Sequence, residues 1–287
     1  MNASPQKPTN IEDPEVRSIT LLHPLQWLAL AWRDMARCGW VSFAHGLVLA
    51  LLGWAILLLA HDKFWLLAGA FSGFMVIAPV LATSLYALSR ALERGEKANF
   101  ALVHKVWSSW QQSHANKWGN DYWALVQFGT LLALAALGWM LTSAAFVTLF
   151  TPVPVNSPLE FIRYVVLAKD GFVFELWLGL GGLLAAPMFA SSVVSIPLLL
   201  DRRVTLKQAV LTSWRTVLAN PLPMAFWAFL IMGFTLLGLA SLLLGLIIIM
   251  PMLGHASWHA YRDLVDVSDL PERTPRPDSK PPTEAGR

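Results

Sequence analysis

Long runs of apolar residues alternate with short polar segments along most of the chain. Four runs are each long enough for a membrane-spanning helix: residues 41–60, 64–88, 122–150 and 172–200. A hydrocarbon core of about 30 Å is crossed by roughly 20 helical residues, because a helix pairs all of its backbone polar groups internally. A fifth run, 222–262, is too long for one crossing, and we predict two, over 222–238 and 242–262. The pattern predicts an all-α integral membrane protein with six transmembrane helices.

The fifth run leaves an alternative open. Its expected turn, at residues 237–241, is almost wholly apolar, so a single bent helix would place the C-terminus on the other side of the membrane. With six spans, 18 of the 21 Lys and Arg residues lie on the side where the chain starts, whereas five spans give 13 against 8. Positively charged loops stay in the cytoplasm, so the charges favour six spans with both termini cytoplasmic.

Composition supports the membrane class. Of the 287 residues, 56% are hydrophobic and only 14% are charged, and the mean hydropathy is +0.53. The single cysteine, Cys38, excludes an internal disulfide framework and a cysteine metal cluster. The net charge of +3 reflects the basic loops expected on the cytoplasmic side, and it favours contact with the lipid bilayer and its anionic headgroups. It gives no evidence for nucleic acid.

The two ends of the chain differ from its middle. Residues 1–18 and 266–287 combine prolines with scattered charges, and we expect both to be flexible cytoplasmic tails. The first long apolar run starts near Val41, too late for a secretory signal peptide. The membrane domain is therefore expected over residues 19–265.

An internal repeat is visible in the predicted hairpins. The second helix of each contains a Gly followed six residues later by a Pro: Gly73 and Pro79, Gly181 and Pro187, Gly245 and Pro251. A mid-helix proline removes a backbone hydrogen bond and bends or loosens the helix. We predict three hairpins that repeat in the same orientation, because each contains two spans.

A shorter amphipathic segment precedes each hairpin. Apolar residues at helical spacing form the three stripes: Leu25, Leu28, Trp32 and Met35; Phe100, Val103, Trp107 and Trp110; Leu206, Val210, Trp214 and Leu218. Such helices lie in the headgroup region with aromatic residues toward the lipid. We therefore expect three cytoplasmic surface helices that brace the hairpins and anchor them.

Few side chains with catalytic or ligating chemistry fall within the predicted spans. His255, His259 and Asp263 share one face of the last helix at spacings of four, and His45 lies at a similar depth in the first span. Facing each other, His45 and His255 can ligate a b-type haem, and with Asp263 the histidines suit a divalent metal. The alternative is that these histidines hydrogen-bond to neighbouring helices. Glu175 is a further candidate, an intramembrane carboxylate for transport.

Several sequence stretches resemble a bacterial family of predicted integral membrane proteins of unknown function. They are Trp32-Arg33-Asp34, Ile77-Ala78-Pro79, the run from Leu88 to Gly95, and the run from Gly254 to Leu264. Some members of that family carry the label of a cytochrome c oxidase subunit. Seven histidines in the whole chain are too few within the spans for a haem-copper catalytic subunit. The resemblance, over most of residues 19–265, implies a location in the bacterial inner membrane, and it implies no catalytic residues.

We therefore expect a non-enzymatic accessory, assembly or scaffold protein that packs with lipid or with other inner-membrane proteins. A small-solute transporter and a haem or metal protein are the alternatives.

Overall fold

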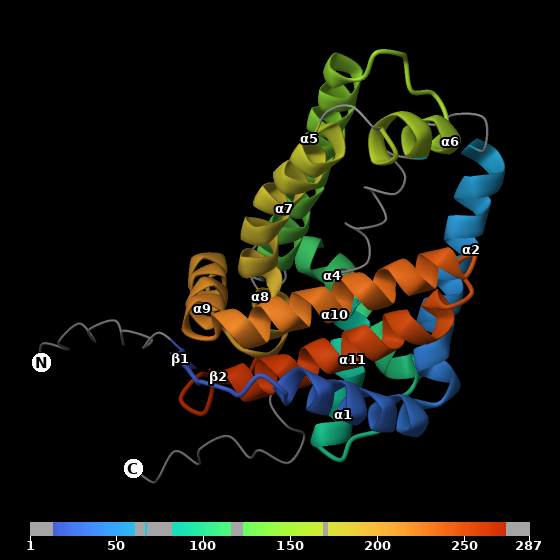
Figure 1. Ribbon diagram of the computed structural model, residues 1–287. Coiled ribbons are helices and arrows are strands. Elements are labelled where there is room, and N and C mark those ends of the chain that lie inside the picture. The colour runs from blue at the N-terminus through green and yellow to red at the C-terminus, as the bar shows by residue number, and fades with distance from the viewer. Residues whose placement is uncertain (1–13, 61–66, 68–81, 116–122, 169–171, 274–287) are drawn as a thin grey trace, which may run out of the picture.

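The computed structural model describes residues 14–60, 67, 82–115, 123–168 and 172–273 (Figure 1). Its elements, in chain order, are β1 (Glu15–Val16), α1 (His23–Cys38), α2 (Trp40–Ala60), α4 (Phe100–Ala115), α5 (Trp123–Phe150), α6 (Pro158–Phe161), the π-helical η1 (Ile162–Val166), α7 (Val173–Ser192), α8 (Ser195–Asp201), α9 (Leu206–Ala219), α10 (Pro221–Ala240), α11 (Leu246–Leu264) and β2 (Val265–Asp266). Residues 82–93 are also helical and are called helix 82–93 below. The all-α class is confirmed, whereas most of the predicted span 64–88, with Gly73 and Pro79, lies outside the described residues.

Four helical stretches within the described ranges are long and apolar enough to cross a membrane. They are Trp40–Leu59, Ala124–Phe150, Val173–Asp201 and Pro221–Ala240. Large apolar side chains cover their outer faces, for example Leu149, which is 77% exposed, and Leu183, which is 70% exposed. A water-soluble protein rarely exposes such continuous apolar surface, so these faces are suited to lipid.

The fifth apolar run forms two helices, and the alternative of one bent helix is wrong. Helix α10 ends at Ala240 and α11 begins at Leu246. The turn between them holds Leu242 and Leu243 in left-handed conformations, with φ of 55° and 69°. The turn lies a few residues beyond the one expected at 237–241. Helix α11 is not among the four apolar stretches, because its C-terminal half carries polar and charged residues.

Helix α11 packs at the centre of the described structure, against α1, α2 and α10. Ten of its 19 residues are buried, His255 and Trp258 among them. Next to it the rings of Trp27 and Trp227 pack edge to face with centroids 5.5 Å apart. Protein surrounds this helix on several sides, so its polar residues face partners rather than lipid.

The three predicted units recur in element order but are not packed alike. Each of α1, α4 and α9 precedes a long helix, as expected. The α10–α11 pair, however, runs across the direction of the α5–α7 pair (Figure 1). The repeated hairpin arrangement therefore stays a prediction.

The two ends of the described chain meet. Strand β1 pairs antiparallel with β2, and Arg17 forms an ion pair with Asp266. The Asn220 side chain accepts a hydrogen bond from the Ile19 amide and donates one to the Arg17 carbonyl. The prediction of flexible tails over 1–18 and 266–287 is thus wrong at their inner ends, because backbone pairing orders residues 14–18 and 266–273. Both ends lie on the same side of the molecule.

Helix α1 buries a face that overlaps only in part with the predicted stripe, since Met35 belongs to both. Helix α1 turns Trp27, Ala31 and Met35 inward and leaves Leu25 and Trp32 exposed. Hydrophobic spacing locates an apolar face, but it does not tell whether protein or lipid covers it.

Candidate functional site

A chain of hydrogen bonds joins α1, α2, helix 82–93 and α11. Its centre is His255 on α11, whose side chain is fully buried. The ring Nε2 lies 2.8 Å from Ser42 Oγ of α2, and Nδ1 lies 2.6 Å from Ser89 Oγ of helix 82–93. Ser89 donates in turn to a carboxylate oxygen of Asp34 on α1, at 2.7 Å. Four separate segments therefore meet around one imidazole.

These bonds hold the imidazole in one tautomer. A serine hydroxyl carries a single proton, and Ser89 gives that proton to Asp34. Ser89 must then accept from the Nδ1–H of His255, which leaves Nε2 of a neutral ring to accept from Ser42. Both ring nitrogens are satisfied, as buried polar atoms require.

Asp34 binds a second partner on α11. Nε2 of His259 lies 2.9 Å from the same Asp34 oxygen that accepts from Ser89. Burial alone would raise the pKa of Asp34, but the hydrogen bonds from His259 and Ser89 outweigh it and hold the pKa below its usual value. The carboxylate thus stays charged and fixes α1 on α11.

His45 makes separate contacts. Its Nδ1 lies 2.8 Å from the Val41 carbonyl oxygen, and its Nε2 lies 2.7 Å from Ser84 Oγ. The first bond stays within α2, and the second ties α2 to helix 82–93. The predicted facing pair of His45 and His255 therefore lies in one region of the core, with each ring engaged by its own partners.

The predicted metal and haem ligands are also bound to protein. Asp263 accepts a hydrogen bond of 2.7 Å from Nε1 of Trp27, while His255 and His259 bind the serines and Asp34 described above. Over the part of the chain that the structure describes, no group of three or more His, Cys, Asp or Glu side chains is placed to hold a metal ion. The geometry supports the alternative that these histidines bond to neighbouring helices. Haem or metal binding stays a prediction that requires these bonds to break.

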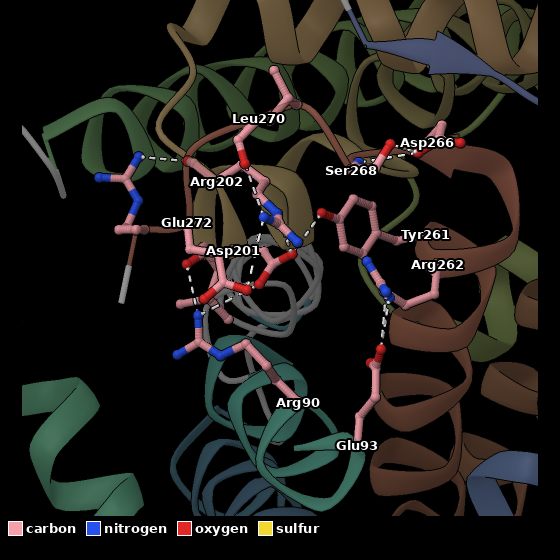
Figure 2. Close-up of polar contacts among 12 residues, drawn as sticks. Arg90, Glu93, Asp201, Arg202, Tyr261, Arg262, Asp266, Ser268, Leu270 and Glu272 are labelled. Atoms are coloured by element: carbon pink, nitrogen blue, oxygen red, sulfur yellow. Dashed lines mark hydrogen bonds and ion pairs between the residues drawn. The ribbon is translucent and has the colours of Figure 1, made fainter. Parts of the chain in front are cut away.

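A second buried cluster surrounds Asp201 at the end of α8 (Figure 2). Its carboxylate is 2% exposed and accepts from the Tyr261 hydroxyl at 2.9 Å and from Nε of Arg202 at 3.0 Å. Guanidinium nitrogens of Arg94 and Arg90 lie 3.6 and 3.9 Å from its other oxygen. A buried carboxylate needs such compensation, because loss of hydration is costly.

The segment after β2 closes over this cluster. Glu272 lies 3.3 Å from Arg94 and 3.8 Å from Arg202, and the Arg273 amide donates to the Asp201 carbonyl. Arg202 also donates to the Leu270 carbonyl at 2.9 Å (Figure 2). The C-terminal segment thus links the end of α11 to the end of α8.

Sequence reasoning missed the Asp201 cluster. These arginines follow predicted spans and were counted only as markers of the cytoplasmic side. The available signal was the position of Asp201, a carboxylate placed directly after an apolar run and directly before Arg202 and Arg203. Several other arginines also follow apolar runs, so the spacing alone did not identify the partners.

The remaining candidates are Glu175 and the glycines and prolines of the repeat, and the structure places those among the described residues in or at the ends of helices. Glu175 is exposed in the first turn of α7, where a carboxylate favours the helix dipole. A ring carbon of Trp139 lies 3.1 Å from where a Cβ on Gly181 would be. Pro187 and Pro251 lie within α7 and α11, and the Gly245 amide donates to Ser241 Oγ at the start of α11.

The chain matches, over residues 66–201, the model of a family described as predicted integral membrane protein (DUF2189). This match confirms the resemblance to a family of predicted integral membrane proteins of unknown function, over a shorter range than the predicted 19–265. It includes Asp201, Arg90 and Arg94 of the second cluster, and it excludes α1 and α11. Neither a curated protein nor a solved structure matches the chain.

Proposed function

We propose that this integral membrane protein of unknown function acts without catalysis, through contacts of its outer surface with lipid and with other inner-membrane proteins. In this proposal it crosses the membrane six times, with both termini in the cytoplasm, and serves as an accessory, assembly or scaffold protein. The distribution of charged loops supports that orientation, and the β1–β2 pairing supports an even number of crossings.

One observation carries the proposal. The buried polar side chains described above bind one another, while apolar side chains cover the outside of the long helices. His255 and Asp201 each bind neighbouring protein groups inside the structure. On the outside, Leu141 of α5 and Leu183 of α7 are 59% and 70% exposed. The exposed apolar side chains are therefore available to contact lipid or other proteins, whereas these buried polar side chains are already bound to protein groups.

Site-specific photo-crosslinking tests the proposal. A photoreactive amino acid is placed at Leu141 or Leu183, and the buried Leu198 serves as the matched control. We expect cross-links to defined membrane proteins from the two exposed sites and none from Leu198. Lipid adducts alone at both exposed sites would contradict the scaffold role.

An absorption spectrum and a metal analysis of the detergent-purified protein test the haem and metal hypotheses. We expect a colourless, metal-free sample, because both ring nitrogens of His45 and of His255 have protein partners. A Soret band that disappears in His255→Ala would overturn the proposal in favour of haem binding.

A further inference from the structure

We propose that the outer face of α1 binds the headgroups of anionic phospholipids in the leaflet where α2 begins. The inference rests on the proposed function, since it requires α2 to cross the membrane, and it adds the site and the ligand class. The site consists of Leu25, Trp32, Arg33 and Arg37 on α1, together with Trp40 at the start of α2.

The connection to α2 fixes where α1 lies. A single residue, Gly39, separates the end of α1 at Cys38 from the start of α2 at Trp40. Gly39 has a φ of 57°, in the left-handed region that favours glycine, and the chain changes direction there (Figure 1). With α2 across the bilayer, the end of α1 that is joined to Trp40 lies at headgroup depth.

The outer face has the composition of an interfacial helix. Leu25, Trp32 and Trp40 are 46%, 57% and 64% exposed, although α1 already buries another apolar face against α11. The helix is therefore apolar on two sides, which suits protein on one side and the acyl boundary on the other. Exposed tryptophans beside the start of a span are typical of the membrane interface.

Charge selects anionic headgroups among the lipids. Arg33 and Arg37 are exposed one turn apart next to Trp32, and the structure records no ion pair for either within the described residues. The only carboxylate of α1, Asp34, points inward to Ser89 and His259 and does not neutralise them. Two guanidinium groups are therefore left for phosphate oxygens, which they bind in a bidentate manner.

The third unit repeats the construction. Helix α9 buries Ala209 and Thr212 while Leu211 and Leu218 are 43% and 72% exposed. A single residue, Asn220, again separates this helix from the next long one, α10. Within the described residues, α1 and α9 thus both present an exposed apolar face directly before a long apolar helix.

Binding of short-chain lipids by the full-length protein tests the proposal. Dioctanoyl phosphatidylglycerol or dioctanoyl phosphatidylcholine is titrated into the protein in a neutral detergent, and bound lipid is counted by native mass spectrometry. We expect phosphatidylglycerol to bind more tightly, and Arg33→Gln or Arg37→Gln to weaken its apparent Kd by about fivefold each. Arg33→Lys, which keeps the charge, retains most of the binding.

Arg163→Gln is the matched control, since Arg163 is exposed on η1 and remote in sequence from α1. We expect its titration to equal that of the wild type. Equal binding of both lipids, or Arg33→Gln and Arg37→Gln titrating like Arg163→Gln, would overturn the proposal and leave the face for an acidic protein segment. Such a result does not affect the cross-linking at Leu141 and Leu183, so the two proposals fail separately.

Discussion

Gly46→Ala is the substitution that best tests the packing of α2 on α11. A Cβ at Gly46 would lie 2.5 Å from the carbonyl oxygens of both Leu246 and Ile247. These are backbone atoms of the facing helix, so they cannot rotate away as a side chain end can. Ordinary contact begins at 3.4 Å, and the two helices must therefore separate by about 0.9 Å.

The expected cost combines two opposing effects. Overpacking of this kind destabilises by about 1–3 kcal/mol, and exchange of glycine for alanine in a helix returns about 0.5–1 kcal/mol. The separation also affects the bond between Ser42 and His255, which is 2.8 Å long and lies one turn away on α2. We therefore expect a net loss of about 1–2 kcal/mol in the free energy of unfolding.

Gly138→Ala provides the control, because no atom lies within 4 Å of the corresponding Cβ on α5. Both glycines lie in long apolar helices, so the change in helix propensity is common to the two variants. Unfolding is followed by circular dichroism in one detergent, with heat and with denaturant. We expect Gly138→Ala to equal or exceed the wild type and Gly46→Ala to fall below it. Equal stability of the two variants would refute the close approach of α2 and α11.

Three further predictions concern buried side chains. Asp201→Asn removes a buried charge among arginines, and we expect it to lower the free energy of unfolding by about 3 kcal/mol or more. Tyr261→Phe removes one hydrogen bond and is expected to lower it by about 1 kcal/mol. Equal unfolding free energies of the two variants would contradict this. Burial raises the pKa of the Cys38 thiol to about 11. We therefore expect maleimide at pH 8 to label it on the order of 100-fold more slowly in the folded than in the unfolded protein. Rapid labelling of the folded protein would argue against the burial of this thiol. Because the pKa of Asp34 is lowered in the folded protein, its stabilising contribution is complete above about pH 5 and is lost as the pH falls through its folded value. Asp34→Asn should be less stable than the wild type at pH 7 and lose less stability below pH 4; parallel profiles in acid denaturation would exclude the Asp34–His259 pair.

The long apolar helices could be predicted from the sequence because lipid imposes a simple rule on them. Runs of about 20 apolar residues can bury their backbone only as helices, so the bounds expected for 41–60, 122–150 and 222–238 differ from α2, α5 and α10 by no more than two residues. The spacing of His255 and His259 likewise placed them on one face of α11.

The partners of these side chains could not be predicted. Ser42, Ser89 and Asp34 come from three separate segments, and nothing in their local sequence indicates that they meet at His255. The inner ends of the tails were mistaken for flexible chain for the same reason. Their order comes from pairing between Val16 and Val265, which lie almost the whole chain apart.

The central claim is that the chain crosses the membrane an even number of times, with both ends in the cytoplasm, and cysteine accessibility tests it most directly. Single cysteines are introduced into a Cys38→Ser background at the exposed positions Ser18, Asp269, Leu159 and Leu244. A membrane-impermeant maleimide is applied to right-side-out and to inside-out vesicles. We predict that Ser18→Cys and Asp269→Cys react only in inside-out vesicles, and that Leu159→Cys and Leu244→Cys react only in right-side-out vesicles. Labelling of Ser18→Cys and Asp269→Cys from opposite sides would contradict the account. Labelling of Leu244→Cys in inside-out vesicles alone would mean that α10 and α11 do not cross the membrane, which reduces the number of spans by two.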